Sequence, residues 1–177
     1  MKIVKALNED LSNIMLLISS AVKKMNMEGS YQWDNCYPNE EVISTDIKEN
    51  SLYILKDGEN YLGIIVLNEE QPVEYKDVNW ENSIGNILVI HRMAVNPLYQ
   101  GQGIAKKLMQ FTEEFALKNN YLSIRTDTYI ENIKMQSLFT KCGYNKTGSV
   151  FFNNGKQKPF LCYEKIINLT FTDENSH

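Results

Sequence analysis

The segment from residue 85 to residue 105 constrains the fold most, because a buried strand ends there and a turn with two glycines leads directly into a helix. Residues 85–95 (GNILVIHRMAV) carry apolar side chains on both faces, as strands at the centre of a sheet do. Asn96-Pro97 ends this strand, and Gly101 and Gly103 precede the helix. Such a junction leaves backbone N–H groups unpaired, with the positive end of the helix dipole behind them. It therefore predicts an α/β fold with an anion-binding loop.

The remaining segments predict the other strands and helices of a mixed sheet. Apolar residues at helical spacing and β-branched runs bounded by turn residues give the boundaries, with Asn8 as the N-cap of the first helix. We expect strands at 2–6, 51–56, 61–68, 85–95, 121–127, 144–152 and 160–167, and helices at 8–29, 39–49, 103–119 and 132–142. The order β-α-α-β-β-β-α-β-α-β-β predicts a mostly antiparallel sheet of about seven strands with helices on both faces.

Length and composition limit the class of protein. The 177 residues fit one domain, which we expect at 1–168, with a disordered tail at 169–177. The net charge of −4 disfavours a general nucleic-acid binder. Three cysteines outside any C-x-x-C pair indicate neither a disulfide framework nor a metal site. Without a signal peptide or an apolar run long enough to span a membrane, we expect a cytoplasmic protein, monomeric or homodimeric.

Arginine is scarce, which restricts how an anion could be bound. Only Arg92 and Arg125 occur among the 18 basic residues. We expect Arg92, on the opposite face of its strand from the predicted site, to be a structural ion-pair partner. An anion site must therefore depend on lysine or on backbone N–H groups.

Three kinds of phosphate-binding loop compete for the two-glycine turn. A dinucleotide-binding loop requires a third glycine where Lys106 stands. A P-loop requires Gly-Lys-Ser/Thr, but Ile104 follows Gly103. The third pattern, Q/R-x-x-G-x-G/A, is matched by Gln100, Gly103 and Ala105. An ordinary strand-to-helix turn, with glycines for tight packing, is the alternative to all three.

The matched pattern resembles the coenzyme A loop of the GNAT superfamily of N-acetyltransferases. A strand ending in M-A-V-x-P, the helix after the glycines, Asn132, and K-C-G-Y at 141–144 follow in the family's order, and the resemblance covers roughly residues 1–167. It implies acetyl-CoA as cosubstrate and direct acetyl transfer to a primary amine of a small molecule or peptide in a ternary complex. A non-catalytic acyl-CoA-binding or sensing module of the same fold is the alternative.

The resemblance also implies where the cosubstrate binds. The backbone at the end of the central strand would bond the pantetheine arm, and N–H groups of the loop would hold the pyrophosphate. Asn132 would contact the pantetheine, although it serves equally as a helix N-cap. The residues implied to bind the cofactor are Met93, Ala94, Val95, Gln100, Gly101, Gln102, Gly103, Ile104, Ala105, Asn132 and Phe139.

The sequence departs from the family at the proton donor. The usual acid is a tyrosine seven residues after the asparagine, where this chain has Phe139, which cannot donate a proton. Tyr129 and Tyr144 are candidate replacements, and each is equally explained as a packed aromatic residue.

His91 is the main candidate for the general base. Strict alternation puts it on the same face as Val89, Met93 and Val95, and an unperturbed histidine titrates near neutrality. It also resembles the histidine of the arylalkylamine branch of the superfamily. A core histidine bonded to a carbonyl explains it equally well. Glu74, Asp127 and Asp34 are further candidates.

The acceptor amine should enter opposite the cofactor. Carboxylates and aromatic rings suit an ammonium group through charge pairing and cation–π contact. The loop after the first helix and the connection before the central strand contain Gln32, Trp33, Asp34, Tyr37, Tyr75 and Trp80. As substrate-binding residues we predict Trp33, Asp34, Tyr37, Trp80 and Asp127. The two tryptophans are equally explained as parts of a lid packed over the core.

Overall fold

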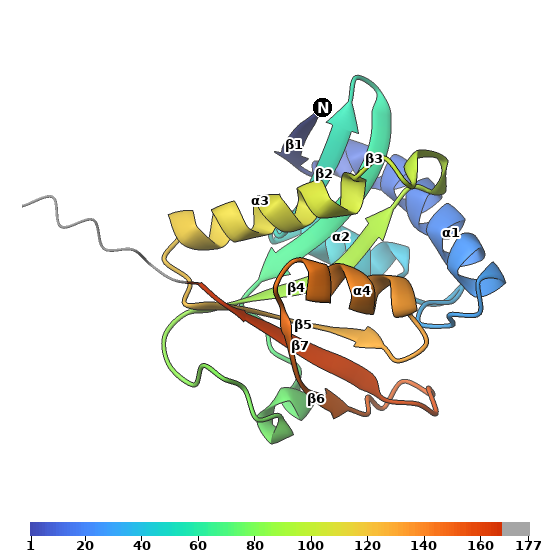
Figure 1. Cartoon of the computed structure of the whole chain (residues 1–177). Helices are drawn as coiled ribbons and strands as arrows, with labels where there is room; N and C mark the ends of the chain where they lie inside the picture. The colour runs from blue at the N-terminus through green and yellow to red at the C-terminus, as the bar shows by residue number, and fades with distance from the viewer. Residues whose placement is uncertain (168–177) are drawn as a thin grey trace, which may run out of the picture.

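The predicted succession of strands and helices is present in a computed structural model that describes residues 1–167 (Figure 1). The strands are β1 (Lys2–Lys5), β2 (Leu52–Asp57), β3 (Asn60–Asn68), β4 (Ile87–Val95), β5 (Ser123–Tyr129), β6 (Asn145–Val150) and β7 (Phe160–Ile166). The helices are α1 (Leu11–Met27), α2 (Glu40–Lys48), α3 (Ile104–Lys118) and α4 (Ile133–Lys141), with 3₁₀ turns η1 (Asn8–Asp10), η2 (Val73–Asp77) and η3 (Pro97–Tyr99). The predicted disordered tail lies outside the described residues.

All seven strands form one sheet in the order β1-β2-β3-β4-β5-β7-β6. Every neighbouring pair is antiparallel except β4 and β5, which run parallel. The mixed, mostly antiparallel sheet is therefore confirmed. β4 lies at its centre, as the two-sided apolar pattern of its sequence indicates.

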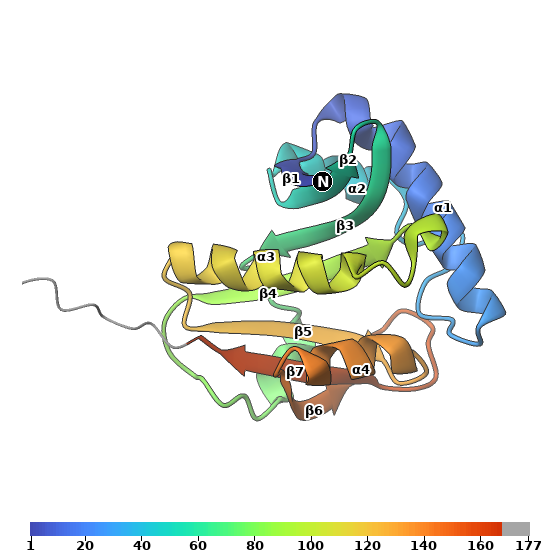
Figure 2. The same ribbon diagram turned by 45° about the horizontal axis from the view of Figure 1, so that its top comes forward.

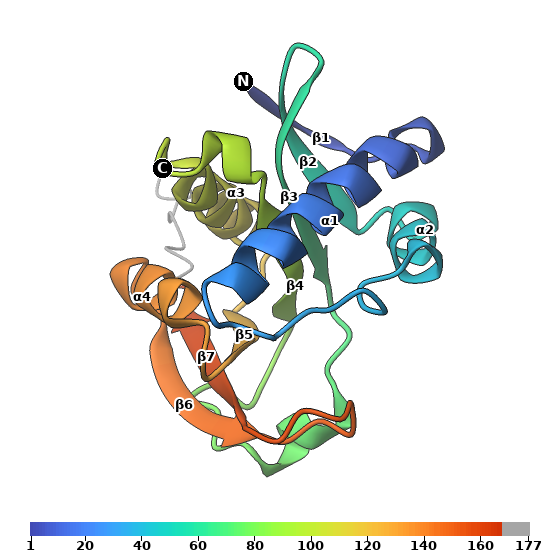
Figure 3. The same cartoon turned by 90° about the vertical axis from the view of Figure 1, so that its right-hand side faces the viewer.

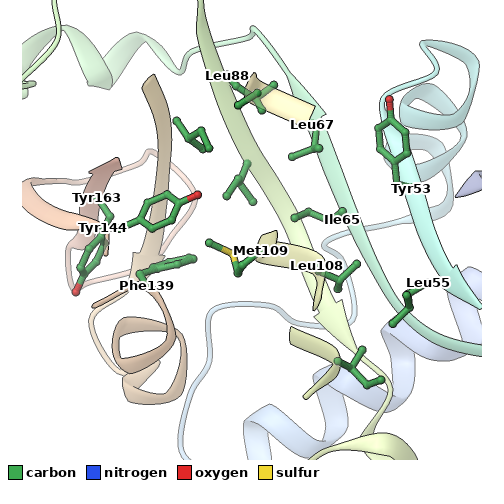
Figure 4. Packing of buried hydrophobic residues seen from close by; sticks show 14 of the residues in the cluster. Tyr53, Leu55, Ile65, Leu67, Leu88, Leu108, Met109, Phe139, Tyr144 and Tyr163 are labelled. Carbon is green, nitrogen blue, oxygen red and sulfur yellow. The ribbon is translucent and has the colours of Figure 1, made fainter. Parts of the chain in front are cut away.

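The helices cover both faces of the sheet. α1 and α2 bury Ile14 and Ile43 against one face, and α3 and α4 bury Leu108 and Phe139 against the other. Figure 4 shows the second core, where Leu108 and Met109 of α3 lie beside the strands and Phe139 lies beside two tyrosines. A smaller cluster packs η2 on β4, β5 and β7 through Tyr75 and other buried residues.

The first helix begins later than the sequence predicts. Asn8 lies in η1, and α1 starts at Leu11, so the prediction of Asn8 as its N-cap was wrong. Asp10 is the residue that organises this end, because its Oδ2 accepts a hydrogen bond from the backbone N–H of Leu7 at 2.8 Å. Asp10 therefore stabilises a 3₁₀ turn that precedes the helix.

A bulge in β4 reverses the expected alternation of its side chains. Ile64 pairs with Ala94 and Val66 with His91, so two residues of β4, Arg92 and Met93, stand opposite one residue of β3, Ile65. Arg92 lies in the bulge with a φ of 31°. Met93 and Val95 consequently pack with the α3 and α4 core, whereas Val89 packs under η2. The prediction that Met93 and Val95 share one face with His91 was therefore wrong, because the inserted residue lies between them and His91 and shifts the alternation. Val89 lies on the same side of the bulge as His91, so the predicted alternation holds between these two residues.

β4 and β5 are paired over only a short part of their length. Residues 87–89 pair with residues 123–125, and beyond these pairs both strands continue without pairing to each other. Figure 2 shows the two strands starting side by side and diverging toward the end that faces α1. The sheet is therefore open at its centre, at the carboxyl ends of its two parallel strands.

Candidate active site

The opening between β4 and β5 continues into a cavity of about 1390 Å³. Its lining comes from both strands, the end of α1, the loop between α1 and α2, the loop before α3, α4, and residues near the start of β7. In Figure 3 the loop after α1 crosses in front of β5. The cavity is large enough for an extended ligand together with a second, smaller one.

The glycine loop before α3 forms one end of this cavity. Asn96 fixes the start of the loop, because its Oδ1 accepts from Leu98 N at 3.1 Å and its Nδ2 donates to Tyr61 O at 3.0 Å. Gly101 and Gly103 have φ values of 80° and 75°, in the left-handed region. A Cβ at either glycine would meet no atom within 4 Å, so the space beside both is free for a ligand.

The start of α3 presents donors to this space. The first backbone bond of the helix runs from Lys107 N to Gly103 O, at 3.0 Å. The N–H groups of Ile104, Ala105 and Lys106 therefore have no carbonyl in their own helix to donate to. Together with the helix dipole, they make a site suited to the pyrophosphate of coenzyme A.

Both arginines are engaged in ion pairs with other side chains, although Arg92 also lines the cavity. Arg92 forms a two-bond ion pair with Asp46, with Nε and Nη2 each 2.6 Å from a carboxylate oxygen, which confirms its predicted structural role. Arg125 pairs with Glu164 at 3.0 Å and lies 4.3 Å from the centre of the Trp80 ring. A phosphate in the cleft must therefore rely on backbone donors and lysines.

Asn132 caps α4 at the far side of the cleft. Its Oδ1 accepts from Met135 N at 3.3 Å, which confirms its role as an N-cap. Its Nδ2 donates to Gln32 Oε1 at 3.0 Å, and the same oxygen accepts from Thr128 Oγ1 and Tyr129 N. Gln32 thus ties the loop after α1 to the end of β5, and Asn132 still borders the cavity.

His91 lines the cavity and also bonds to a backbone carbonyl. Its Nε2 is 2.9 Å from Asn68 Oδ1 and 3.1 Å from Glu70 O. Both partners accept, so Nε2 carries the proton and Nδ1 is left unprotonated. Burial, helped by the positive charge of Arg92, lowers the pKa of His91 to about 4. The ring is therefore neutral at physiological pH.

Asp127 is a carboxylate deep in the cleft. Tyr75 donates a hydrogen bond from its hydroxyl to Asp127 Oδ2 at 2.7 Å. Burial raises the pKa of Asp127 to about 6, although the hydrogen bond from Tyr75 acts in the opposite direction. Asp127 thus titrates close to neutrality.

Phe139 borders the cavity and belongs to the core. Its ring lies 5.3 Å from that of Tyr163 and 5.9 Å from that of Tyr144, between ring centres. The buried hydroxyl of Tyr144 has no hydrogen-bond partner within the described chain, and Tyr144 does not line the cavity. This arrangement fits the explanation of Tyr144 as a packed aromatic residue.

Most of the residues predicted from the sequence meet in this one cavity. Those that line it are Trp33, Tyr37, His91, Met93, Ala94, Val95, Gln100, Gly101, Gly103, Ile104, Ala105, Asp127, Asn132 and Phe139. Five others, all within the described range, lie outside its lining: Asp34, Glu74, Trp80, Gln102 and Tyr129. Tyr129 packs on Phe160 at 5.0 Å between ring centres, and Asp34 pairs with Lys156 at 3.2 Å. Their predicted roles in the reaction stay predictions.

The cavity also contains residues that sequence reasoning did not assign to the site. Thr126 and Thr128 of β5 line it, together with Phe152 and Phe160. The two phenylalanines lie 13 and 21 residues beyond Phe139, the last predicted site residue. No local motif marks them, because the sheet order brings β7 beside β5 only in the folded chain.

Two further observations concern the described residues as a whole. No helix in residues 1–167 has the length and apolar character needed to cross a membrane. Within the same range, no three His, Cys, Asp or Glu side chains gather where they could share a metal ion.

Comparison with known proteins identifies the family. The model of the acetyltransferase (GNAT) family matches residues 20–144. An acetyltransferase of that family from Streptococcus agalactiae 2603 superposes with a TM-score of 0.80 at 25% identity, over 94% of this chain and 95% of that one. The N-acetyltransferase YesJ of Bacillus subtilis (strain 168) is 22% identical over 81% of each chain. A streptothricin acetyltransferase of Escherichia coli is 33% identical over 40% of this chain and 41% of its own. The chain is an acyltransferase that belongs to the GNAT family.

Proposed function

We propose that this protein transfers the acetyl group of acetyl-CoA directly to a primary amine, with both substrates bound in one ternary complex. The observation that carries the proposal is the cleft between β4 and β5, which ends at a loop with two left-handed glycines and the free N–H groups of α3. One cavity extends from this loop to a group of aromatic and acidic residues. Two substrates can therefore meet in it.

The chain's own groups fit coenzyme A. The backbone of Met93 and Val95, on the part of β4 that does not pair with β5, can bond an extended pantetheine arm as a further strand would. The N–H groups of residues 104–106 can hold the pyrophosphate without an arginine. When bound, the cosubstrate supplies an acetyl group activated as a thioester.

The acceptor end of the cavity has the chemistry of an amine site. Trp33, Tyr37 and Phe152 supply aromatic surface, while Glu70 and Asp127 supply negative charge. An ammonium group attached to an apolar body matches both features. One relative is named for streptothricin, but it aligns with less than half of this chain, so we carry over the class of reaction and not that acceptor.

The test is steady-state turnover of acetyl-CoA with a panel of arylalkylamines, polyamines, amino acids and N-terminal peptides. Release of free thiol should depend on the amine, and mass spectrometry should find the acetylated acceptor. Varying both substrates should give intersecting double-reciprocal lines, as a ternary complex requires. Parallel lines, the ping-pong pattern of a covalent intermediate, would contradict direct transfer.

Phe139 favours a second candidate function. A member of the family that lacks a proton donor at this position could bind acyl-CoA without transferring the acyl group, and so act as a sensor. The same assay separates the two functions. Tight binding of acetyl-CoA by calorimetry, with no thiol release for any acceptor, would favour the sensor.

A further inference from the structure

Asp127 and Tyr75 form a part-buried pair at the wall of the cleft that the family comparison does not explain. Tyr75 comes from η2 and Asp127 from β5, 52 residues apart in the chain, and the phenol donates to Oδ2 of the carboxylate at 2.7 Å. Among residues 1–167, no side chain or backbone group donates to Oδ1. Because Asp127 lines the cavity, one carboxylate oxygen is fixed by the protein and the other is left for a ligand.

We propose that Asp127 receives the ammonium group of the acceptor and removes its proton, and that Tyr75 is the residue that positions the carboxylate. This inference rests on the proposed acetyl transfer and names the residue that prepares the amine for it. Asp127 would touch the substrate, so it is the catalytic residue. Tyr75 acts only through Asp127.

Tyr75 is held rigidly enough for this role. Its side chain is 2% exposed, and its ring lies 4.8 Å from that of Trp80, between ring centres. The indole N–H of Trp80 donates to the backbone carbonyl of Tyr75 at 2.9 Å, and the guanidinium of Arg125 lies on the indole. Since Arg125 is itself paired with Glu164, the position of the phenol is fixed through the sheet.

The groups around Asp127 leave it as the site of proton uptake. Glu74 and Tyr75 face it from η2, Cys162 is its partner on β7, and His91 lies across the cleft on β4. Burial raises the pKa of Tyr75 well above its usual range and that of the Cys162 thiol to about 12, so neither is a base near neutrality. Burial lowers the pKa of His91 to about 4, which makes its ring a weak base. Asp127, with a pKa of about 6, is ionised at pH 7 and basic enough to take a proton.

The protons of the reaction can be balanced although Phe139 cannot donate one. The acceptor enters as R–NH₃⁺, and its first proton passes to Asp127 and then to water. The nitrogen lone pair so freed forms the N–C bond to the acetyl carbon, and the C–S bond of the thioester breaks. The second proton is lost from nitrogen after the N–C bond forms and ends on the sulfur. The products are the amide, the free thiol and one proton in solution, without a tyrosine acid at position 139.

The test compares Asp127→Asn and Tyr75→Phe with wild type in the pH dependence of kcat/KM. For the wild type, kcat/KM should rise through a pKa of about 6 and fall again at the pKa of the free amine. Asp127→Asn should lower kcat/KM by about 100-fold at neutral pH and remove the acidic inflection. In wild type the hydrogen bond from Tyr75 lowers the pKa of Asp127. Tyr75→Phe removes this bond and should therefore move the inflection to higher pH.

Tyr163→Phe is the matched control, because Tyr163 is a buried tyrosine on β7 that does not line the cavity. It should leave the inflection in place. A purely structural role for Tyr75 would lower the amount of folded protein without moving the inflection. Circular dichroism and thermal unfolding of each variant distinguish the two effects.

A binding experiment separates failure of this inference from failure of the proposed function. Calorimetry with free coenzyme A present should show that wild type prefers 2-phenylethylamine to 2-phenylethanol, and that Asp127→Asn loses the preference. Wild-type rates in Asp127→Asn, or an unchanged preference, would overturn the role of Asp127 alone. No turnover of any amine by wild type, and no preference for the ammonium, would overturn the proposed function and this role with it.

Discussion

Single residues in the cleft have features that fit a binding site, namely left-handed glycines beside open space and a carboxylate with a displaced pKa. Gly101 and Gly103 adopt a left-handed backbone conformation beside open space, and Asp127 is a carboxylate whose pKa is raised by burial. Neither feature is needed to form the sheet. Both are explained by the ligands that the cleft is proposed to bind, because glycine lets the backbone approach a ligand closely and displaced pKa values concentrate at functional sites.

Replacing Gly103 tests the pyrophosphate site. Gly103→Glu should weaken acetyl-CoA binding at least tenfold, because it adds bulk and negative charge where the N–H groups of α3 point, and it should cost about 1–2 kcal/mol of backbone strain. Gly58→Ala is a control with a φ of 57° and equally open surroundings, in the β2–β3 turn. The Gly58→Ala variant should be less stable than wild type, but calorimetry should find its affinity for acetyl-CoA unchanged. Unchanged affinity of Gly103→Glu would contradict the loop assignment.

Phe139→Tyr tests whether the chain can still use a proton donor at the family's position. The ring borders the cavity, so the added hydroxyl has space on the ligand side. We expect kcat to rise severalfold, up to about tenfold, because a positioned acid helps the thiolate to leave. Stopped-flow measurement of thiol release checks this. An unchanged kcat in a folded variant would show that proton delivery to sulfur does not limit the rate.

At the scale of elements, the bulge in β4 decides what the central strand presents to the cleft. The inserted residue directs the Arg92 side chain to Asp46 of α2, and its Nη1 donates to the hydroxyl of Tyr37 at 3.0 Å. One buried ion pair therefore joins the bulge, α2 and the loop that lines the acceptor end. We regard the pair as the support of that loop.

Breaking this pair should destabilise the fold strongly. Asp46→Ala leaves the Arg92 guanidinium largely buried without its partner, which costs about 3 to 5 kcal/mol in the free energy of unfolding. The solvent-exposed pair of Lys134 with Glu28 is the control, since Lys134→Ala should cost about 0 to 1 kcal/mol. Urea denaturation measures both. Similar values for the two variants would show that the buried pair is not a main support.

At the scale of the whole molecule, the cleft places two groups with opposite pH effects on stability across from each other. His91 has a folded-state pKa of about 4, below its ordinary 6.5, so the unfolded chain binds the extra proton and stability is lost as pH falls between these values. Asp127 has a folded-state pKa of about 6, above its ordinary 3.8, so stability is lost as pH rises between these values. Where the two pH ranges overlap, the two groups change the free energy of unfolding in opposite directions.

Single substitutions should reveal the pH dependence of stability that each group contributes. Asp127→Asn should be about 1 to 3 kcal/mol more stable than wild type at neutral pH, and its stability should increase from about pH 4.5 to about pH 6.5. His91→Gln should show the opposite trend, with stability falling over this range. Urea unfolding at both pH values measures the difference. Identical pH dependence in wild type and both variants would show that neither pKa is displaced.

Much of the fold could be predicted from local patterns. The four helices, the seven strands and the loop before α3 follow from periodicity, caps and turn residues, and most boundaries lie within two or three residues of the expected ones. The cofactor loop is contiguous in sequence, so its motif could be recognised directly. The start of α1 was misplaced, because the side chain of Asp10 stabilises a 3₁₀ turn over residues 8–10 and the α-helix begins only after it.

The acceptor end of the site could not be predicted in the same way. Its residues come from segments between Trp33 and Phe160, and no spacing relates them until the sheet order is known. The bulge at Arg92 was missed because it is set by pairing with β3, not by a local signal. The partnership of Tyr75 with Asp127 is hidden for the same reason, since 52 residues separate them.

The sequence by itself determined which elements form and that an anion-binding loop follows the central strand, because these depend on interactions between near neighbours in the chain. Only the tertiary structure decided how far β4 and β5 separate, which face His91 occupies and which carboxylate titrates near neutrality. A pKa depends on burial and on charges brought close by folding, and strand phase depends on pairing across the sheet. Both are properties of contacts between distant parts of the chain.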